Sequence, residues 1–341
     1  MVNVAVVGCG YWGRNLVRNF AALNSLAAIY DTDQALSEKL ASEHGTCYRP
    51  LEDIFQDSSI QGIVIATPPL SHKAIAEQAL RAHKHILVEK PLALTSRDAE
   101  SLCQLAQQQE RVLMVGHVLQ YHPGFMKLQE MVKQGRLGKL QYVYSNRLNL
   151  GKFRQHENIL WDLAPHDLSM ILSLVGIMPD SVFTTGHCHV NTRIADLTTT
   201  HLTFPGGING HIFLSWLHPY KEHKLIAVGE EGMAVFDDGA DWSQKLQLYE
   251  HRVLWTDGTP VPERAEVSYI SLTPEEPLLR ECEHFLTCIE ANQLPRTGGW
   301  DALSILQVLE AADQSMELKK PVSFPVPFSR TDDALQGPSL N

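Results

Sequence analysis

Residues 8–13, GCGYWG, have the types and spacing of a phosphate-binding loop. This G-x-G-x-x-G segment follows the apolar run 4–7 and precedes a stretch with helical apolar spacing, the context in which the motif is specific. Its glycines allow a tight turn, backbone approach to a pyrophosphate, and close packing of helix on strand. The first free N–H groups of the helix would bind the anion. The segment therefore predicts a dinucleotide site; the alternative is a glycine-rich turn that binds nothing.

An acidic residue and two prolines extend this predicted site. Asp31 ends the next strand-like segment, where an acid hydrogen-bonds the adenosine ribose and repels a 2′-phosphate, so NAD is favoured over NADP. Asp31 could instead cap a turn. The prolines of Ala66-Thr67-Pro68-Pro69 would stiffen a loop beside the cofactor. The candidate cofactor contacts are Gly8, Gly10, Tyr11, Trp12, Gly13, Asp31, Thr67, Pro68, His72, Glu89 and Lys90.

Lys90 is the first candidate for chemistry on a substrate. It stands between Glu89 and Pro91 at the end of an apolar strand, 85–88. A lysine at this edge of the sheet would lie above a bound dinucleotide, and the proline would fix the turn that follows it. Glu89 could pair with it. The alternative is a solvated lysine in a turn.

The elements that must position these residues alternate between strand and helix in the first third of the chain. Apolar runs at 4–7, 26–30, 63–66, 85–88 and 111–115 are separated by helix-like stretches. This predicts a doubly wound parallel sheet. After residue 120 come helices near 123–134, 161–175, 277–292 and 300–316, and strand-like runs between 181 and 250. We expect a dinucleotide-binding domain over 1–119 and, over 120–341, an α+β domain with an open, mostly antiparallel sheet.

The chain resembles the glucose–fructose oxidoreductase/inositol dehydrogenase (Gfo/Idh/MocA) oxidoreductases. The resemblance covers nearly the whole chain and rests on the segments GCGYWG, ATPP, EKP, VGH at 115–117, and Asp162-x-x-x-His166. It implies a Rossmann domain joined to an open-faced α/β domain, and oxidation or reduction of sugar-like alcohols with NAD(P). It also implies a homodimer or homotetramer formed through the open sheet.

The resemblance assigns catalysis to Lys90, Asp162 and His166. Loss of hydride from a carbinol carbon requires a base for the hydroxyl proton, and histidine suits this role near neutral pH. We expect His166 to accept the proton, Lys90 to stabilise the developing negative charge, and Asp162 to orient the imidazole. Without the resemblance, Asp162 could be a helix N-cap and His166 a buried histidine.

A cationic strip precedes these residues in the acidic second half of the chain. The segment 147–156, RLNLGKFRQH, predicts a site for an anionic substrate group, because arginine suits a diphosphate; a solvated sheet rim is the alternative. The WDLAPHD segment resembles enzymes that oxidise C3 of UDP-linked N-acetylamino sugars, often for polysaccharide biosynthesis. The candidate substrate contacts are Lys90, His117, Tyr121, Arg147, Asn149, Lys152, Arg154 and His166.

Composition limits the other classes of partner. The net charge is −11, without the basic stripe of a nucleic-acid-binding protein, and no apolar run reaches the roughly 18 residues of a membrane span. Six scattered cysteines indicate reduced thiols in the cytoplasm. His187-Cys188-His189 lacks further ligands at suitable spacing, so we expect no metal. The leading prediction is an NAD-dependent nucleotide-sugar dehydrogenase. A free-sugar or inositol dehydrogenase and a non-catalytic NAD sensor or repressor are the alternatives.

Overall fold

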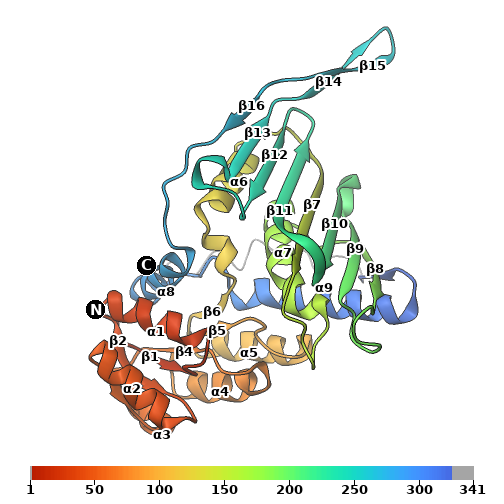
Figure 1. Cartoon of the computed structure of the whole chain (residues 1–341). Coiled ribbons are helices and arrows are strands. Elements are labelled where there is room, and N and C mark those ends of the chain that lie inside the picture. Colours follow the sequence, from red (N-terminus) through yellow and green to blue (C-terminus); the bar gives the residue numbers. More distant parts are fainter. Residues whose placement is uncertain (1, 325–341) are drawn as a thin grey trace.

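The first sheet is parallel, as predicted, and has six strands, one more than the five apolar runs of the sequence (Figure 1). The computed structural model describes residues 2–324. The strand order is β3-β2-β1-β4-β5-β6, so the chain reverses direction across the sheet between β1 and β4. The strands are β1 (Val4–Val7), β2 (Leu26–Tyr30), β3 (Cys47–Tyr48), β4 (Gly62–Ile65), β5 (His85–Glu89) and β6 (Leu113–Gly116). The helices of this part are α1 (Gly13–Ala22), α2 (Gln34–His44), α3 (Leu51–Gln56), α4 (Pro69–Arg81) and α5 (Ser96–Gln108).

A second, nine-stranded sheet occupies the rest of the chain. Its order is β16-β13-β12-β11-β7-β10-β9-β8-β17, and every pair is antiparallel except β7 with β10. The prediction of a mostly antiparallel sheet is confirmed. The strands are β7 (Leu140–Leu150), β8 (Ser181–His187), β9 (Leu197–Thr203), β10 (Asn209–Ser215), β11 (Leu217–Gly229), β12 (Met233–Asp237), β13 (Leu246–Tyr249), β16 (Val267–Tyr269) and β17 (Val322–Ser323).

Helices α6 (Pro123–Lys133), α7 (Ile159–Val175) and α9 (Gly299–Leu318) pack on one side of this sheet (Figure 1). Helix α8 (Pro277–Ala291) instead returns to the first sheet, where Phe285 meets Phe20 of α1 edge to face at 6.5 Å between ring centroids. The predicted domain boundary after residue 119 falls inside a 3-10 helix, Val118–Tyr121, and remains a prediction.

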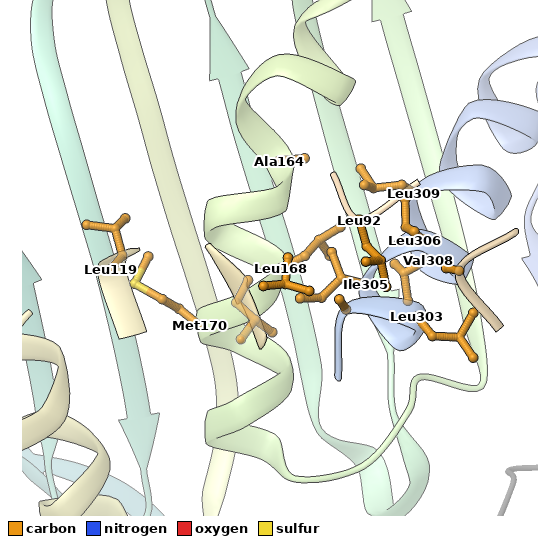
Figure 2. Close-up of a cluster of buried hydrophobic side chains, with 14 of the residues drawn as sticks. Leu92, Leu119, Ala164, Leu168, Met170, Leu303, Ile305, Leu306, Val308 and Leu309 are labelled. Atoms are coloured by element: carbon orange, nitrogen blue, oxygen red, sulfur yellow. The ribbon is translucent and has the colours of Figure 1, made fainter. Parts of the chain in front are cut away.

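The two sheets share a hydrophobic core next to the EKP turn. Figure 2 shows Leu92, which follows the EKP turn, among side chains of α7 such as Leu168 and of α9 such as Leu306. All three are at most 2% exposed. Because interiors are close-packed, this contact holds the end of β5 at a fixed distance from α7. The turn that carries Lys90 is thereby placed beside the helix that carries Asp162 and His166.

A two-stranded hairpin, β14 (Arg252–Thr256) and β15 (Thr259–Glu263), projects from the end of the second sheet (Figure 1). Asp257 and Gly258 form its turn, both with positive φ. Such turns match the twist of a hairpin. The sequence analysis expected no strands here.

Candidate active site

The glycine loop between β1 and α1 fits a dinucleotide. Gly8 has φ +93°, and a Cβ there would lie 2.7 Å from the backbone of Ala66 and Thr67. A Cβ on Gly13 would lie 1.9 Å from the carbonyl oxygen of Gly8. A Cβ on Gly10 would meet open space, so this position is left free for a ligand rather than required by packing. Helix α1 begins at Gly13 and directs its first N–H groups toward this loop.

Asp31 follows β2 and binds the glycine loop. Its Oδ2 accepts a hydrogen bond from the Cys9 backbone N–H at 2.6 Å, and its Oδ1 accepts one from Asp33 N–H at 3.0 Å. The carboxylate therefore stabilises its own turn, the alternative considered above, and also the loop. It remains partly exposed beside Gly10, which is compatible with the predicted contact to ribose.

His72 does not have the place predicted for a cofactor contact. The side chain is 1% exposed, and both ring nitrogens face backbone carbonyls, of Pro91 at 2.8 Å and of Thr67 at 2.7 Å. Burial lowers its pKa. A neutral imidazole has one N–H and donates to one of these two carbonyls, so His72 lies between the ATPP loop and the EKP turn and contacts both. Thr67 itself is partly exposed at the loop, where its hydroxyl accepts a hydrogen bond from Ser71.

Glu89 at the end of β5 is linked to the glycine loop. The indole N–H of Trp12 donates to its carboxylate, and Gly116 of β6 leaves room for it, since a Cβ there would lie 2.9 Å away. Burial raises the pKa of Glu89 to about 7, against the opposing effects of the Trp12 hydrogen bond and Lys90. A second buried carboxylate, Glu281 of α8, interacts electrostatically with it.

Lys90 reaches from the first sheet to α7. Its Nζ donates a hydrogen bond to the backbone carbonyl of Asp162 at 2.9 Å. Burial lowers the pKa of Lys90, and the carboxylates of Asp162, Glu157 and Glu89 oppose this shift. Because an ammonium carries three donors, two remain for a ligand.

Asp162 lies beside Lys90, and its carboxylate bonds residues other than His166. Its Oδ1 accepts from Arg154 at 3.0 Å and its Oδ2 from the indole N–H of Trp216 at 3.2 Å. Within residues 2–324 the carboxylate has these two donors and no hydrogen bond to His166, so the predicted role of Asp162 in orienting the imidazole remains a prediction. Asp162 is also not the helix N-cap; the side chain of Asn158 caps α7.

His166 is a neutral imidazole in a cationic environment. Burial lowers its pKa well below the usual value, and the positive charges of Lys90 and Arg147 add to the shift. Its Nδ1 is buried and has no hydrogen-bond partner among residues 2–324. His117 is similar: it is 3% exposed, both ring nitrogens lack a partner within the same residues, and burial together with Lys90 lowers its pKa to about 3. The two imidazoles and Lys90 thus form one electrostatically coupled group.

Arg147 is not part of an exposed anion-binding strip. It is 6% exposed, and its guanidinium binds Asp167 with two hydrogen bonds, at 2.9 and 3.1 Å. A buried arginine paired in this way has no free donor fork for a diphosphate. The prediction that Arg147 contacts substrate is therefore corrected.

The other predicted substrate residues divide into two groups. Lys152 is exposed, and Arg154 is exposed and forms an ion pair with Asp162. Asn149 is partly buried, and its Oδ1 has no hydrogen-bond partner among the described residues. These three remain candidates. Tyr121 is 3% exposed and its hydroxyl lies 3.1 Å from that of Thr297, so it is committed to the junction with the C-terminal helices rather than to a cleft.

Three further residues of this region were missed. Asp167, adjacent to His166, is 0% exposed and holds Arg147. Trp216 bonds Asp162 from a segment 54 residues away, and Glu281 comes from α8. Only Asp167 had a signal in the sequence, its position next to the predicted base.

The described residues include neither a metal-binding cluster nor a membrane-spanning helix. No group of three or more histidine, cysteine, aspartate or glutamate side chains within 2–324 is arranged to hold a metal ion; His189 pairs with Asp196. None of the helices in this range is long and apolar enough to cross a bilayer.

The chain matches two family models. Residues 2–117 match the oxidoreductase family with an NAD-binding Rossmann fold, and residues 125–235 match the GFO/IDH/MocA C-terminal domain. The chain belongs to the Gfo/Idh/MocA oxidoreductases. It is thus an oxidoreductase of CH–OH groups whose cofactor is NAD, and the glycine loop has the open backbone that this cofactor requires.

Relatives of known activity use sugars or cyclitols. A UDP-N-acetylglucosamine 3-dehydrogenase of Acidithiobacillus ferrooxidans is 28% identical over 294 residues, 86% of this chain and 90% of that protein. A solved structure of that enzyme superposes with a TM-score of 0.82 at 25% identity, covering 93% and 97% of the two chains. An inositol 2-dehydrogenase of Rhizobium meliloti is 25% identical over 310 residues, 88% and 91% of the two chains.

Proposed function

We propose that the protein is an NAD-dependent dehydrogenase that oxidises a secondary alcohol, the C3 hydroxyl, of a nucleotide-linked sugar such as UDP-N-acetylglucosamine or its uronic acid. The hydrogen bond from Lys90 Nζ to the Asp162 carbonyl supports this most directly. It joins the cofactor half to the helix that carries His166, and the electrostatic effect of Lys90 on His166 is a second reason to assign both side chains to the same alcohol.

The residues divide the reaction between them. NAD, when bound, supplies the hydride acceptor. His166, neutral because burial and Lys90 depress its pKa, takes the hydroxyl proton. Lys90 donates one of its free N–H groups to the same oxygen and stabilises the negative charge that develops there. Asp162 and Arg154 form the wall beside them.

The substrate class rests on the dehydrogenase relative and on the cationic rim. Arg147 no longer contributes to that rim, which leaves Lys152 and Arg154 as its cations. Because Lys152 is exposed, its ammonium group is accessible to a diphosphate. A free-sugar or inositol dehydrogenase is the second candidate, favoured by the inositol relative.

The test measures reduced-nicotinamide absorbance with NAD and UDP-N-acetylglucosamine, its uronic acid, or myo-inositol. We expect turnover with a nucleotide sugar and a fall of about 10²–10⁴-fold in kcat for Lys90→Met and for His166→Asn. NAD affinity should be retained in His166→Asn, because His166 is not a candidate cofactor contact. Lys133→Met, on the exposed end of α6, is the control. Turnover of myo-inositol alone would select the second candidate, and tight NAD binding without turnover of any substrate would identify a sensor.

The substrate rim has its own test. Lys152→Ala should raise KM for the nucleotide sugar and leave kcat unchanged, because the Lys152 side chain is exposed and its removal should not disturb the fold. An unchanged KM would remove the diphosphate assignment from this strip.

We also propose that the protein works in the cytoplasm as a homodimer or homotetramer.

A further inference from the structure

The β14–β15 hairpin exposes apolar side chains on both of its faces. Val253 and Trp255 lie on one face and Leu254 and Val261 on the other, with exposed fractions of 56%, 73%, 50% and 44%. The hairpin extends away from the main body (Figure 1). An isolated two-stranded ribbon is at best marginally stable in water, so this arm needs further strands or a covering surface.

The register shows which edge of the hairpin is available. Proline has no N–H, so Pro260 and Pro262 cannot donate within the ladder, and the bonded pairs are Thr256–Thr259, Leu254–Val261 and Arg252–Glu263. The nitrogens of both prolines therefore point outward, and the free edge of β15 lacks donors at these positions. Such prolines block pairing with another strand.

The free edge of β14 has no such block. Val253 and Trp255 alternate with the bonded residues, so their N–H and C=O groups point outward. No described strand pairs with this edge, because the hairpin forms its own two-stranded sheet. An exposed apolar edge with free donors and acceptors is a template for another strand.

We propose that β14 pairs with β14 of a second copy of this chain, antiparallel about a two-fold axis at Leu254. Val253 of each copy then exchanges two hydrogen bonds with Trp255 of the other, and the two Leu254 residues face each other as a non-bonded pair. The result is a four-stranded sheet whose outer edges are the two proline-blocked β15 strands. The arrangement closes on itself, as a two-fold interface requires.

Charge favours a second copy over an unrelated strand. Antiparallel pairing centred on Leu254 places Arg252 opposite Thr256 of the other copy and His251 opposite Asp257. Arg252 thus lies next to the acidic turn residue Asp257 of the other copy at each end of the interface, and like charges do not face each other. Cross-strand pairs of opposite charge and of Trp with a β-branched residue both stabilise a sheet.

A disulfide test follows from the two-fold axis. Non-bonded antiparallel pairs have Cα atoms about 4.5 Å apart, within disulfide range. Leu254→Cys should therefore form an intermolecular disulfide under mild oxidation, seen as a dimer on a non-reducing gel. Val261→Cys is the matched control, on the same face of the hairpin but about 14 Å from its counterpart across three strand spacings. The wild type controls for the exposed Cys47 and Cys188. Absence of the Leu254→Cys dimer, or equal cross-linking of Val261→Cys, overturns the proposal.

A second experiment removes the outward donor without touching the hairpin. Val253→Pro deletes an N–H that the hairpin does not use, whereas Val253→Thr keeps it. Sedimentation velocity should show the wild-type assembly for Val253→Thr and an assembly of half that mass or less for Val253→Pro. A monomeric wild type, or a Val253→Pro variant of unchanged mass, contradicts the pairing.

Discussion

Glu281 of α8 should make the unfolding free energy fall as pH rises. The residue is 0% exposed, and neither carboxylate oxygen has a hydrogen-bond partner among the described residues. Burial raises its pKa well above the usual value, and the neighbouring carboxylate of Glu89 raises it further. The folded protein thus keeps a proton here that the unfolded chain releases near pH 4.3, about the pKa of a free glutamate.

The sign and size of the effect follow from proton linkage. Below about pH 4.3 both states hold the proton, and the stability linked to it is fully present. Above that pH only the folded state holds it, so stability decreases by about 1.4 kcal/mol per pH unit until the folded protein also ionises. Two pH units within this range would cost about 3 kcal/mol. Glu281→Gln cannot ionise and should lack this slope.

Urea denaturation of the protein without cofactor at pH 5, 6 and 7 measures the difference. We expect the stability of Glu281→Gln relative to wild type to increase with pH. A difference in unfolding free energy that is the same at every pH does not test the prediction, because burying the glutamine amide has a free-energy cost of its own. Glu283→Gln, two residues further along α8 and exposed, is the control and should follow the wild type. Parallel pH profiles for wild type and Glu281→Gln would refute a protonated Glu281.

Four further predictions concern the glycine loop and the two arginine–aspartate pairs. Gly13→Ala should abolish NAD binding and lower the melting temperature, because its Cβ would meet the loop backbone at 1.9 Å. Gly10→Ala, which meets only open space, should weaken NAD binding in calorimetry without changing the melting temperature of the free protein. Asp167→Asn should lower the unfolding free energy by about 3–5 kcal/mol, because it leaves Arg147 as a buried unpaired charge. Arg154→Ala removes the partly exposed partner of the buried Asp162 carboxylate, which keeps the Trp216 indole and the nearby Lys90 ammonium, so the same denaturation experiment should show a smaller loss than for Asp167→Asn.

The architecture was predictable from the sequence because local patterns determine it. The run 4–7 is apolar throughout because β1 is covered on both faces, and its G-x-G-x-x-G continuation has few backbone solutions. The antiparallel second sheet followed from its strand spacing. The β14–β15 hairpin was missed because Pro260 and Pro262 suppress a strand assignment, and because a fully exposed ribbon shows no alternation between buried and polar positions.

The site was predictable by residue type and less so by contact. Lys90 does reach the segment of Asp162, as a lysine at that edge of the sheet should. The partner of each charge depended on distant residues. Asp162 accepts a hydrogen bond from Trp216, which lies between β10 and β11, and Arg147 donates to Asp167 on α7. A cation in an acidic domain looks like a ligand site in the sequence, whereas its burial is decided by the packing of sheet on helix.

The return of α8 to the first sheet has a consequence for synthesis on the ribosome. The apolar side chains of β1 and α1, such as Val4 and Phe20, share one cluster with Phe285 and Cys282 of α8. This surface therefore stays in water while some 250 further residues are translated, and a fragment ending after the first sheet would keep it there. We expect the nascent NAD-binding half to expose this apolar surface until α8 emerges, and expression of that half alone to give insoluble protein.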